Sequence, residues 1–251
     1  MLRSLKELLG YQLSAQDGDI GKIHEFFFND DFWAVVYLVV DIGGWFSGRK
    51  VLIAPQSVGQ PEFINQKIPV LLTRGKIKNS PDVETDKPVS RQKEIELHDY
   101  FNWRYYWATL TIPGEPPLPP PIPGEKTEAE LEAKTRMEKD FDTHLRSSRE
   151  VTGYHIAAAD GDIGHLEDII ADDEVWDLRY IVVDTKNWLP GKKVLISPAW
   201  ISKISWSKSK VYIDLTREQI QKSPEYDPTQ PINRDYENVL YDFYGRPKYW
   251  E

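Results

Sequence analysis

Apolar and polar residues alternate over short stretches of this chain, and the same succession of stretches occurs twice. Residues 175–183 read V-W-D-L-R-Y-I-V-V, where large apolar residues alternate with Asp177 and Arg179. A period of two is typical of a β-strand with one buried and one solvated face. When residues 3–107 are aligned with residues 146–250 at a constant offset of 143, without a gap, 38 of the 105 pairs are identical. This repeat is far longer than that of a solenoid, so each copy is predicted to be a domain with its own core.

Within each copy the pattern predicts several short strands separated by turn residues. In the first copy the predicted strands cover residues 20–28, 32–42, 50–54 and 67–72. Asp17-Gly18 and Asp160-Gly161 predict hairpin turns, because Gly tolerates the positive φ of a tight turn. Short strands at this spacing are typical of a small antiparallel barrel or sandwich. A parallel sheet would require long helices between the strands, and the pattern predicts none within a copy.

Each copy is expected to end in a short helical tail, because residues 91–101 and 234–244 have a helical pattern. Many of the tail residues are aromatic, and we expect them to pack on a barrel. The predicted organisation is a first repeat with its tail at 1–107, a linker at 108–145, and a second repeat with its tail at 146–251.

The linker is predicted to have two parts. Residues 113–124 contain seven Pro residues, which favour an extended, semi-rigid spacer. Residues 127–146 then read as a charged helix, and Thr127 with Glu130 fits a capping box at its start.

Composition narrows the classes of function. The formal net charge is -9 and no segment carries an excess of basic residues, which argues against a nucleic-acid groove and against adhesion to an anionic bilayer. The chain has no Cys, which excludes disulfides, iron–sulfur clusters, thiolate zinc sites and a Cys nucleophile. The first residues form no apolar signal stretch, and the apolar run at 32–40 is too short to cross a bilayer as a helix. We therefore expect a soluble, cytoplasmic protein.

The repeated motifs resemble those of the PRC-barrel domain. They are Gly-Tyr, Asp-Gly-x-Ile-Gly, a Val-Val-Asp strand, and Gly-Arg/Lys-Lys-Val-Leu-Ile-x-Pro, and the resemblance extends through about Arg74 and Arg217. That domain is named after the cytoplasmic domain of the photosynthetic reaction centre H subunit, and it also occurs in a ribosome maturation factor. The second copy is most similar to bacterial tandem PRC-barrel proteins. The resemblance implies a mainly β fold with two small antiparallel PRC-type barrels in tandem.

Three non-enzymatic functions are considered, and an enzyme ranks after all three. The favoured one is a scaffold that binds a protein partner, whose identity the sequence does not give. The second is a peripheral subunit of a membrane electron-transfer or photosynthetic complex, as in the H subunit. The third is an RNA-processing adaptor, which the acidic charge disfavours. A tandem copy can reproduce a homodimer contact within one chain, so the repeats are expected to pack face to face about a pseudo-two-fold axis. Both a monomer and a homodimer are compatible with this expectation.

No motif for catalysis, a metal or a cofactor stands out. Asp17-Gly18-Asp19 resembles the start of a calcium loop, but Gly21 stands where a further oxygen ligand is required, and a hairpin turn is the favoured interpretation. The histidines do not have the spacing of a metal site; they are His24, His98, His144, His155 and His165. We therefore expect no catalytic residues, no metal and no cofactor.

Two sets of residues remain as candidates. Asp41 and Asp184 each end a strand near Lys50 or Lys193. They are interpreted as a general base or ligand site, or, as we favour, as anchors of a Gly-rich loop. Aromatic residues in the loops and tails are interpreted as an interaction surface or, as we favour, as intramolecular packing, since many exposed rings would promote aggregation. These residues are Trp45, Trp188, Tyr106, Trp107, Tyr249 and Trp250.

Overall fold

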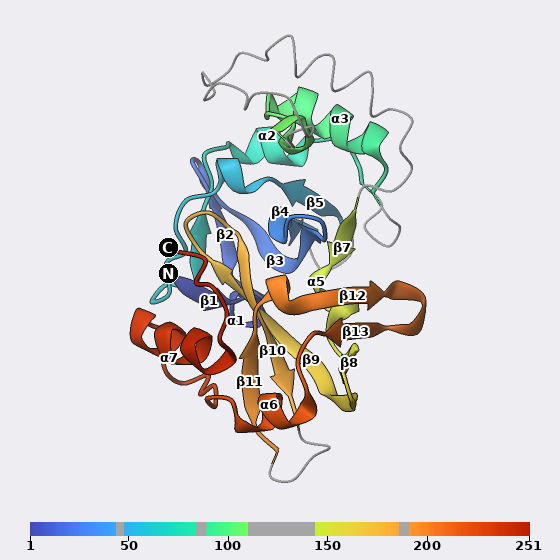
Figure 1. Ribbon diagram of the computed structural model, residues 1–251. Helices are drawn as coiled ribbons and strands as arrows, with labels where there is room; N and C mark the ends of the chain where they lie inside the picture. Colours follow the sequence, from blue (N-terminus) through green and yellow to red (C-terminus); the bar gives the residue numbers. More distant parts are fainter. Residues whose placement is uncertain (44–47, 84–88, 110–143, 186–190) are drawn as a thin grey trace. The chain divides into compact units, whose positions relative to one another are not determined.

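The computed structural model describes residues 1–43, 48–83, 89–109, 144–185 and 191–251. The chain is mainly β and forms two compact units, and Figure 1 labels most of their helices and strands. Unit 1 contains Met1–Leu9, Phe32–Val35 and Ser147–Glu251. Unit 2 contains Gly10–Asp31 and Val36–Arg146. Unit 1 therefore combines most of the second repeat with two short segments of the first, and unit 2 combines most of the first repeat with the linker and Arg146.

The sheet of unit 2 follows the strand order β5-β4-β3-β2-β6, and β7 also pairs with β3. Its strands are β2 (Gln12–Ala15), β3 (Gly18–Asn29), β4 (Ala34–Asp41), β5 (Lys50–Ile53), β6 (Lys67–Pro69) and β7 (Leu145–Ser147). Strand β4 is buried from residue 34 to residue 40, as expected for a continuous run of β-branched and aromatic residues. Gly18 has φ 125° at the turn between β2 and β3, which confirms the predicted hairpin.

The sheet of unit 1 follows the order β11-β10-β9-β8-β13-β12, and β1 also pairs with β9. Its strands are β1 (Leu2–Ser4), β8 (His155–Ala158), β9 (Gly161–Asp172), β10 (Leu178–Asp184), β11 (Lys193–Ile196), β12 (Ile201–Ser205) and β13 (Lys210–Ile213). The core lies along β10 and β11, where Val183, Val194, Leu195 and Ile196 are fully buried.

The strand arrangement differs from the predicted antiparallel barrels in two ways. One pair in each unit is parallel, namely β2 with β6 and β8 with β13. No long crossover helix is needed for the parallel pair of unit 2. Strands β3, β4 and β5 lie between β2 and β6 in the sequence and connect them. In addition, the end strands of each path do not pair with each other in the described residues, so no closed barrel is observed.

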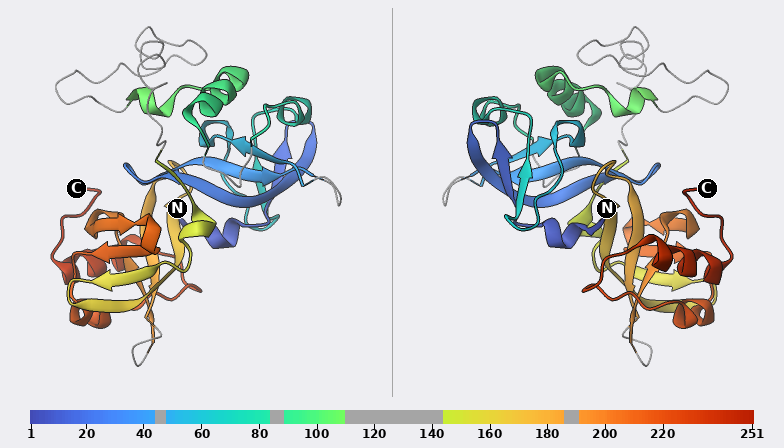
Figure 2. Two further views of the ribbon diagram at one scale, coloured as in Figure 1. Left: turned by 90° about the vertical axis from the view of Figure 1, so that its right-hand side faces the viewer. Right: turned by 90° about the vertical axis from the view of Figure 1, so that its left-hand side faces the viewer.

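The helices are short except for α3 and α7. They are α1 (Leu5–Leu8), α2 (Arg74–Lys78), α3 (Arg91–Phe101), α5 (Ser148–Val151), α6 (Arg217–Lys222) and α7 (Arg234–Tyr244), with single 3₁₀ turns at η1 (Pro55–Ser57), η2 (Tyr106–Thr109), η3 (Pro198–Trp200) and η4 (Trp206–Lys208). Among the described residues, no helix combines the length and the apolar character that crossing a membrane requires. Figure 2 shows α7, in red, beside the strands of unit 1, where Tyr241 contacts Tyr180 of β10.

Local capping explains where α3 and α7 begin and end. The Ser90 side chain accepts a hydrogen bond from the amide of Lys93, and Asn233 accepts one from the amide of Tyr236. Each helix ends at a left-handed residue, Asn102 (φ 59°) in α3 and Gly245 (φ 61°) in α7. Asx and Ser caps followed by a left-handed C-terminal residue are the usual boundaries of an α-helix.

The strands β1 and β7 are exchanged between the two repeats. Residues 2–4 and 145–147 both read Leu-Arg-Ser. In unit 1, β1 pairs antiparallel with β9, with Leu2 opposite Asp172 and Ser4 opposite Ile170. In unit 2, β7 pairs with β3. The sequence predicted a helix as far as residue 146, but Leu145 and Arg146 are in a strand because they complete the edge of β3; the rest of the predicted linker lies outside the described residues.

Candidate functional site

A buried carboxylate connects the helix α3 of unit 2 to its sheet. Glu94 has no exposed surface. Its Oε1 accepts hydrogen bonds from the hydroxyl of Tyr37 on β4 (3.1 Å) and the hydroxyl of Tyr106 in η2 (2.7 Å). The guanidinium of Arg91 donates to Oε2 at 2.7 Å. The carboxylate is therefore held by three donors from the strand, the helix and the tail.

Burial has a large effect on the electrostatics of this group. Desolvation raises the pKa of Glu94 to about 7, against the opposing effects of Arg91 and of the two tyrosine hydroxyls. Desolvation and the neighbouring carboxylate also raise the pKa of Tyr37 and of Tyr106 well above the ordinary value. Glu94 is thus a buried group whose charge changes near neutral pH.

His98 extends this network by one more hydrogen bond. Its Nε2 lies 2.8 Å from the Tyr37 hydroxyl and its Nδ1 lies 2.6 Å from the carbonyl oxygen of Arg104. A carbonyl only accepts, so Nδ1 carries hydrogen. The single hydroxyl hydrogen of Tyr37 cannot point to both Glu94 and a neutral His98. Both contacts of the Tyr37 hydroxyl, to Glu94 and to His98, are hydrogen bonds when either Glu94 or Nε2 of His98 is protonated and supplies the second hydrogen.

Unit 1 contains the same arrangement at an offset of 143 residues. Glu237 of α7 accepts hydrogen bonds from the hydroxyls of Tyr180 (2.7 Å) and Tyr249 (2.9 Å). Arg234 lies 3.0 Å from its second oxygen. The position of His98 is taken by Tyr241, so the histidine contact of unit 2 has no counterpart in unit 1.

The arginines of the two networks also contact the last aromatic residue of each tail. The guanidinium of Arg91 lies 4.2 Å from the centre of the Trp107 ring, and that of Arg234 lies 4.1 Å from the centre of the Trp250 ring. Such cation–π contacts stabilise by about 0.5–2 kcal/mol. The networks therefore attach the tails to the sheets.

Of this set, Tyr37, Glu94, Arg91 and their counterparts were not predicted from the sequence. A signal was available, because all of them are identical in the two copies. Polar residues that stay identical while their neighbours differ indicate a shared interaction.

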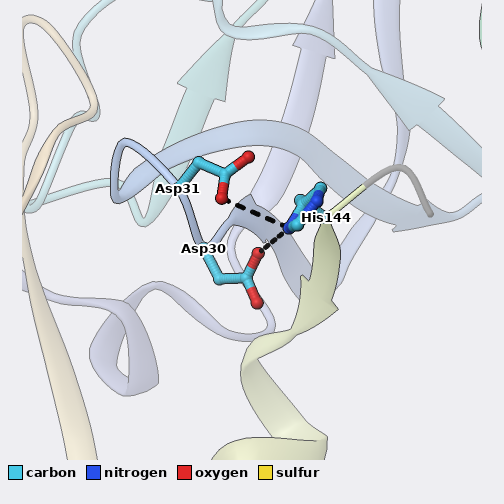
Figure 3. A group of neighbouring side chains, drawn as sticks. All are labelled: Asp30, Asp31 and His144. Atoms are coloured by element: carbon cyan, nitrogen blue, oxygen red, sulfur yellow. Dashed lines mark hydrogen bonds and ion pairs between the residues drawn. The ribbon is translucent and has the colours of Figure 1, made fainter. Parts of the chain in front are cut away.

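A second group of charged residues gathers at the start of the exchanged strand β7 in unit 2. Figure 3 shows that Nδ1 of His144 faces two carboxylates, Asp30 at 3.0 Å and Asp31 at 3.3 Å. Their ligand atoms lie within 4.8 Å of one another, and carboxylate and imidazole groups are ligands that zinc accepts. The other oxygen of Asp30 accepts a hydrogen bond from Arg146 at 2.8 Å.

The equivalent place in unit 1 shows what this group does. The buried Asp173 corresponds to Asp30, and it binds two cations, Arg3 at 3.3 Å and the amino group of Met1 at 2.5 Å. Thus His144 occupies the position that an ammonium occupies in the other unit. We interpret the Asp173–Arg3 and Asp30–Arg146 ion pairs as contacts that fix the exchanged strands β1 and β7.

The predicted aromatic residues have different environments. Trp45 and Trp188 lie outside the described residues. Trp107 is 1 % exposed and stacks on Tyr105, with ring centres 4.9 Å apart. Tyr249 is 38 % exposed. The remaining two, Tyr106 and Trp250, are partly buried and contact the tail residues beside them. All four described rings make contacts within their own unit.

The predicted loop anchors lie at the ends of paired strands. Asp41 is opposite Lys50, and Asp184 is opposite Lys193. The carboxylate of Asp41 accepts a hydrogen bond from the amide of Gly43 at 2.9 Å, which is consistent with the anchoring role. Asp184 is buried. Lys193 instead extends to Glu167, where Nζ lies 2.8 Å from Oε1.

Comparison with known proteins identifies one domain. Residues 146–220, which are 75 of the 251 residues, match the PRC-barrel domain. This confirms the resemblance for the second copy, whereas for the first copy it stays a prediction. No curated protein matches the chain.

Proposed function

We propose that this protein is a non-enzymatic interaction module, built from two repeats of PRC-barrel type, that binds another protein through helix α7. The PRC-barrel match at residues 146–220 supports an interaction role. The repeated carboxylates also support this role. Glu94 and Glu237 each accept a hydrogen bond from a tyrosine of the tail, so both have a structural role. The observation that carries the proposal is the outer face of α7.

The outer face of α7 exposes apolar side chains. Val239 is 57 % exposed and Phe243 is 42 % exposed. Residues four apart are neighbours on a helix surface, so the two side chains form one patch. Such a patch on a soluble domain marks an interaction site more often than a scattered apolar residue does.

The first copy does not have this patch. The positions of Val239 and Phe243 are taken by Glu96 and Tyr100 in α3. The hydroxyl of Tyr100 donates to the carbonyl of Lys76 at 2.9 Å, so that residue has a partner within unit 2. The two helices otherwise share their buried network, so the apolar patch distinguishes the second copy from the first.

Two acidic residues lie beside the patch, and one of them, Asp242, pairs with Lys248 at 3.1 Å. Asp235 and Asp242 are exposed on α7. A complementary partner would present an apolar surface flanked by basic residues. The overall charge of -9 has the same sign and would favour the encounter with such a partner.

The experiment uses the full chain in three forms, which are the natural sequence, a variant of the α7 patch and a control variant. Proteins captured by each form are identified and purified, and the affinity of each form for them is then measured. Replacing both Val239 and Phe243 by Ser should weaken binding at least about tenfold, because buried apolar anchors dominate interface energies. Ile64→Ser is the control, since Ile64 is 98 % exposed but lies in unit 2. A partner that binds the α7 variant as tightly as the natural chain would refute the proposed surface.

The identity of the captured proteins also tests the broader alternatives. Subunits of a membrane redox complex would favour a peripheral role like that of the reaction centre H subunit. Ribosomal proteins would favour an RNA-processing adaptor.

A further inference from the structure

Three side chains from distant parts of the sequence face one position in unit 2. Asp30 and Asp31 lie in the turn after β3, and His144 is the residue before β7. Figure 3 shows Nδ1 of His144 directed at both carboxylates. His144 and Asp30 are 114 residues apart in the sequence, so the spacing of the histidines could not predict a metal site here.

The distances within this group are close to those between neighbouring ligands of a zinc ion. Nδ1 of His144 lies 3.0 Å from Oδ1 of Asp30 and 3.3 Å from Oδ1 of Asp31. Zinc binds nitrogen and oxygen at about 2.0–2.2 Å in a tetrahedron, which places two of its ligands about 3.3–3.6 Å apart. Both distances from the imidazole nitrogen are within a few tenths of an ångström of that spacing.

An ion pair with a protonated histidine serves the two carboxylates unequally. A protonated imidazole carries a single hydrogen on Nδ1, and this hydrogen can be directed well at only one carboxylate. The contact with Asp30 is a hydrogen bond, whereas the longer contact with Asp31 is only an ion pair. A divalent cation at the same place contacts all three atoms and balances the charges of both carboxylates.

Unit 1 provides independent evidence that this position takes a cation. The offset of 143 residues relates the three side chains to counterparts in unit 1, which are Asp173, Glu174 and Met1. The amino group of Met1 lies 2.5 Å from Asp173 and 3.8 Å from Glu174. An ammonium supplies the positive charge itself, whereas a neutral imidazole supplies a lone pair that binds a metal ion. A metal ion on His144 therefore restores the charge that unit 1 obtains from the ammonium.

Two further contacts hold the ligands in place. The amide of Asp30 donates to the carbonyl oxygen of His144 at 3.0 Å, which ties the two segments together. Nε of Arg146 donates to Oδ2 of Asp30 at 2.8 Å, so that Oδ1 faces His144. Partners of this kind orient the ligands of metal sites. The side chains of His144 (40 % exposed) and Asp31 (55 % exposed) are open to solvent, so an ion can reach them.

We propose that unit 2 binds one Zn²⁺ ion through Nδ1 of His144, Oδ1 of Asp30 and Oδ1 of Asp31. The remaining coordination position takes water, as in other zinc sites with three protein ligands. Because His144 precedes β7 and the aspartates follow β3, the ion connects the exchanged strand to the sheet that receives it. Calcium and magnesium fit this site less well, because both prefer a larger set of oxygen ligands.

The first test titrates the full chain, stripped of metal with EDTA and dialysed, with ZnCl₂ in an isothermal calorimeter. The titration is run at about pH 7.5, since ligands must be deprotonated to bind a metal. We expect saturable binding of one ion per chain, and binding of CaCl₂ at least about tenfold more weakly. Absence of saturable zinc binding, or equal affinity for calcium, would overturn the proposal.

Variants locate the ion on the chain. His144→Gln and Asp31→Asn should each weaken zinc binding at least about tenfold, because each removes a ligand. His155→Gln is the matched control and should leave the affinity unchanged. His155 lies opposite His165 across β8 and β9, and such a pair of imidazoles can also take up zinc. Unchanged affinity in a folded His144→Gln protein would show that the ion binds elsewhere.

A readout on the natural chain decides the matter if a variant does not fold. Thermal melts in EDTA verify the fold of each variant. Long-range ¹H–¹⁵N spectra of the histidine rings then follow the zinc titration of the natural chain. The ring nitrogens of His144 should shift with zinc, and those of His155 and His165 should not. Shifts at His155 and His165 without a shift at His144 would refute the proposed site.

Discussion

The second Gly of each Asp-Gly-Asp-Ile-Gly motif is required by a close approach between two strands. A Cβ on Gly164 would overlap the carbonyl oxygen of Asp184 and lie 2.9 Å from its carbonyl carbon. Gly21 has the same relation to Asp41. The motif therefore combines two functions of Gly, a left-handed turn at Gly161 (φ 137°) and space for the crossing strand at Gly164.

We expect Gly164→Ala to lower the unfolding free energy of unit 1 by about 2–3 kcal/mol, because backbone atoms rather than a flexible side chain must move. Gly75→Ala is the control. Gly75 lies in α2 with no heavy atom within 4 Å of the added Cβ, so this change should be neutral or stabilise by up to about 1 kcal/mol. Urea unfolding of both variants measures the difference, and equal stability of the two would contradict the steric explanation.

Helices α3 and α7 show which parts of an element can be predicted from its sequence. Their caps are local signals, Ser90 or Asn233 at the start and a left-handed residue at the end. Their buried glutamates were not predicted, because Glu94 and Glu237 lie in charged segments and look like surface residues until the two copies are compared. Burial of a charge depends on donors from distant elements, such as Tyr37 and Tyr180, and a local pattern does not contain that information.

The attachment of α3 is predicted to depend on pH. The folded chain raises the pKa of Glu94 from its ordinary 4.5 to about 7. Between these values the folded chain keeps a proton that the unfolded chain has lost. The contribution of the Glu94 proton to the free energy of unfolding, up to about 3 kcal/mol, is therefore fully present below about pH 4.5. It is lost as the pH rises from 4.5 to about 7.

Urea unfolding at a series of pH values between 4.5 and 8 measures this slope. Glu94→Gln should flatten it, since an amide does not ionise. Glu96→Gln removes an exposed charge from the same helix and should retain the slope of the natural chain. Equal slopes for the natural chain and the Glu94→Gln variant over this interval would show that Arg91 keeps Glu94 ionised throughout.

At the scale of the whole molecule, the exchange of β1 and β7 could not have been predicted. The two strands have the same sequence, Leu-Arg-Ser. Either one is therefore compatible with the edge of β3 and with the edge of β9, and no local pattern distinguishes a partner in the same copy from a partner in the other copy. The ion pairs at Asp30 and Asp173 stabilise the exchanged arrangement.

The exchange predicts how the molecule responds to cleavage of its linker. A protease site inserted within residues 113–124 would separate the chain into two fragments, each of which supplies a strand to the unit formed mainly by the other. The first fragment supplies β1 to β9, and also backbone contacts such as the carbonyl of Trp33, which accepts from the amide of Leu178 at 2.7 Å. The second supplies β7 to β3.

We therefore expect the cut protein to elute from a sizing column at the volume of the intact chain, without denaturant. Deletion of residues 2–8 removes β1 and should raise the concentration that the fragments need to stay together. The uncut deletion variant controls for loss of fold. If the fragments of the full sequence separate at micromolar concentration, the exchanged strands do not hold them together. Strand pairing and the Asp30–Arg146 and Asp173–Arg3 ion pairs would then be too weak to replace the covalent linker.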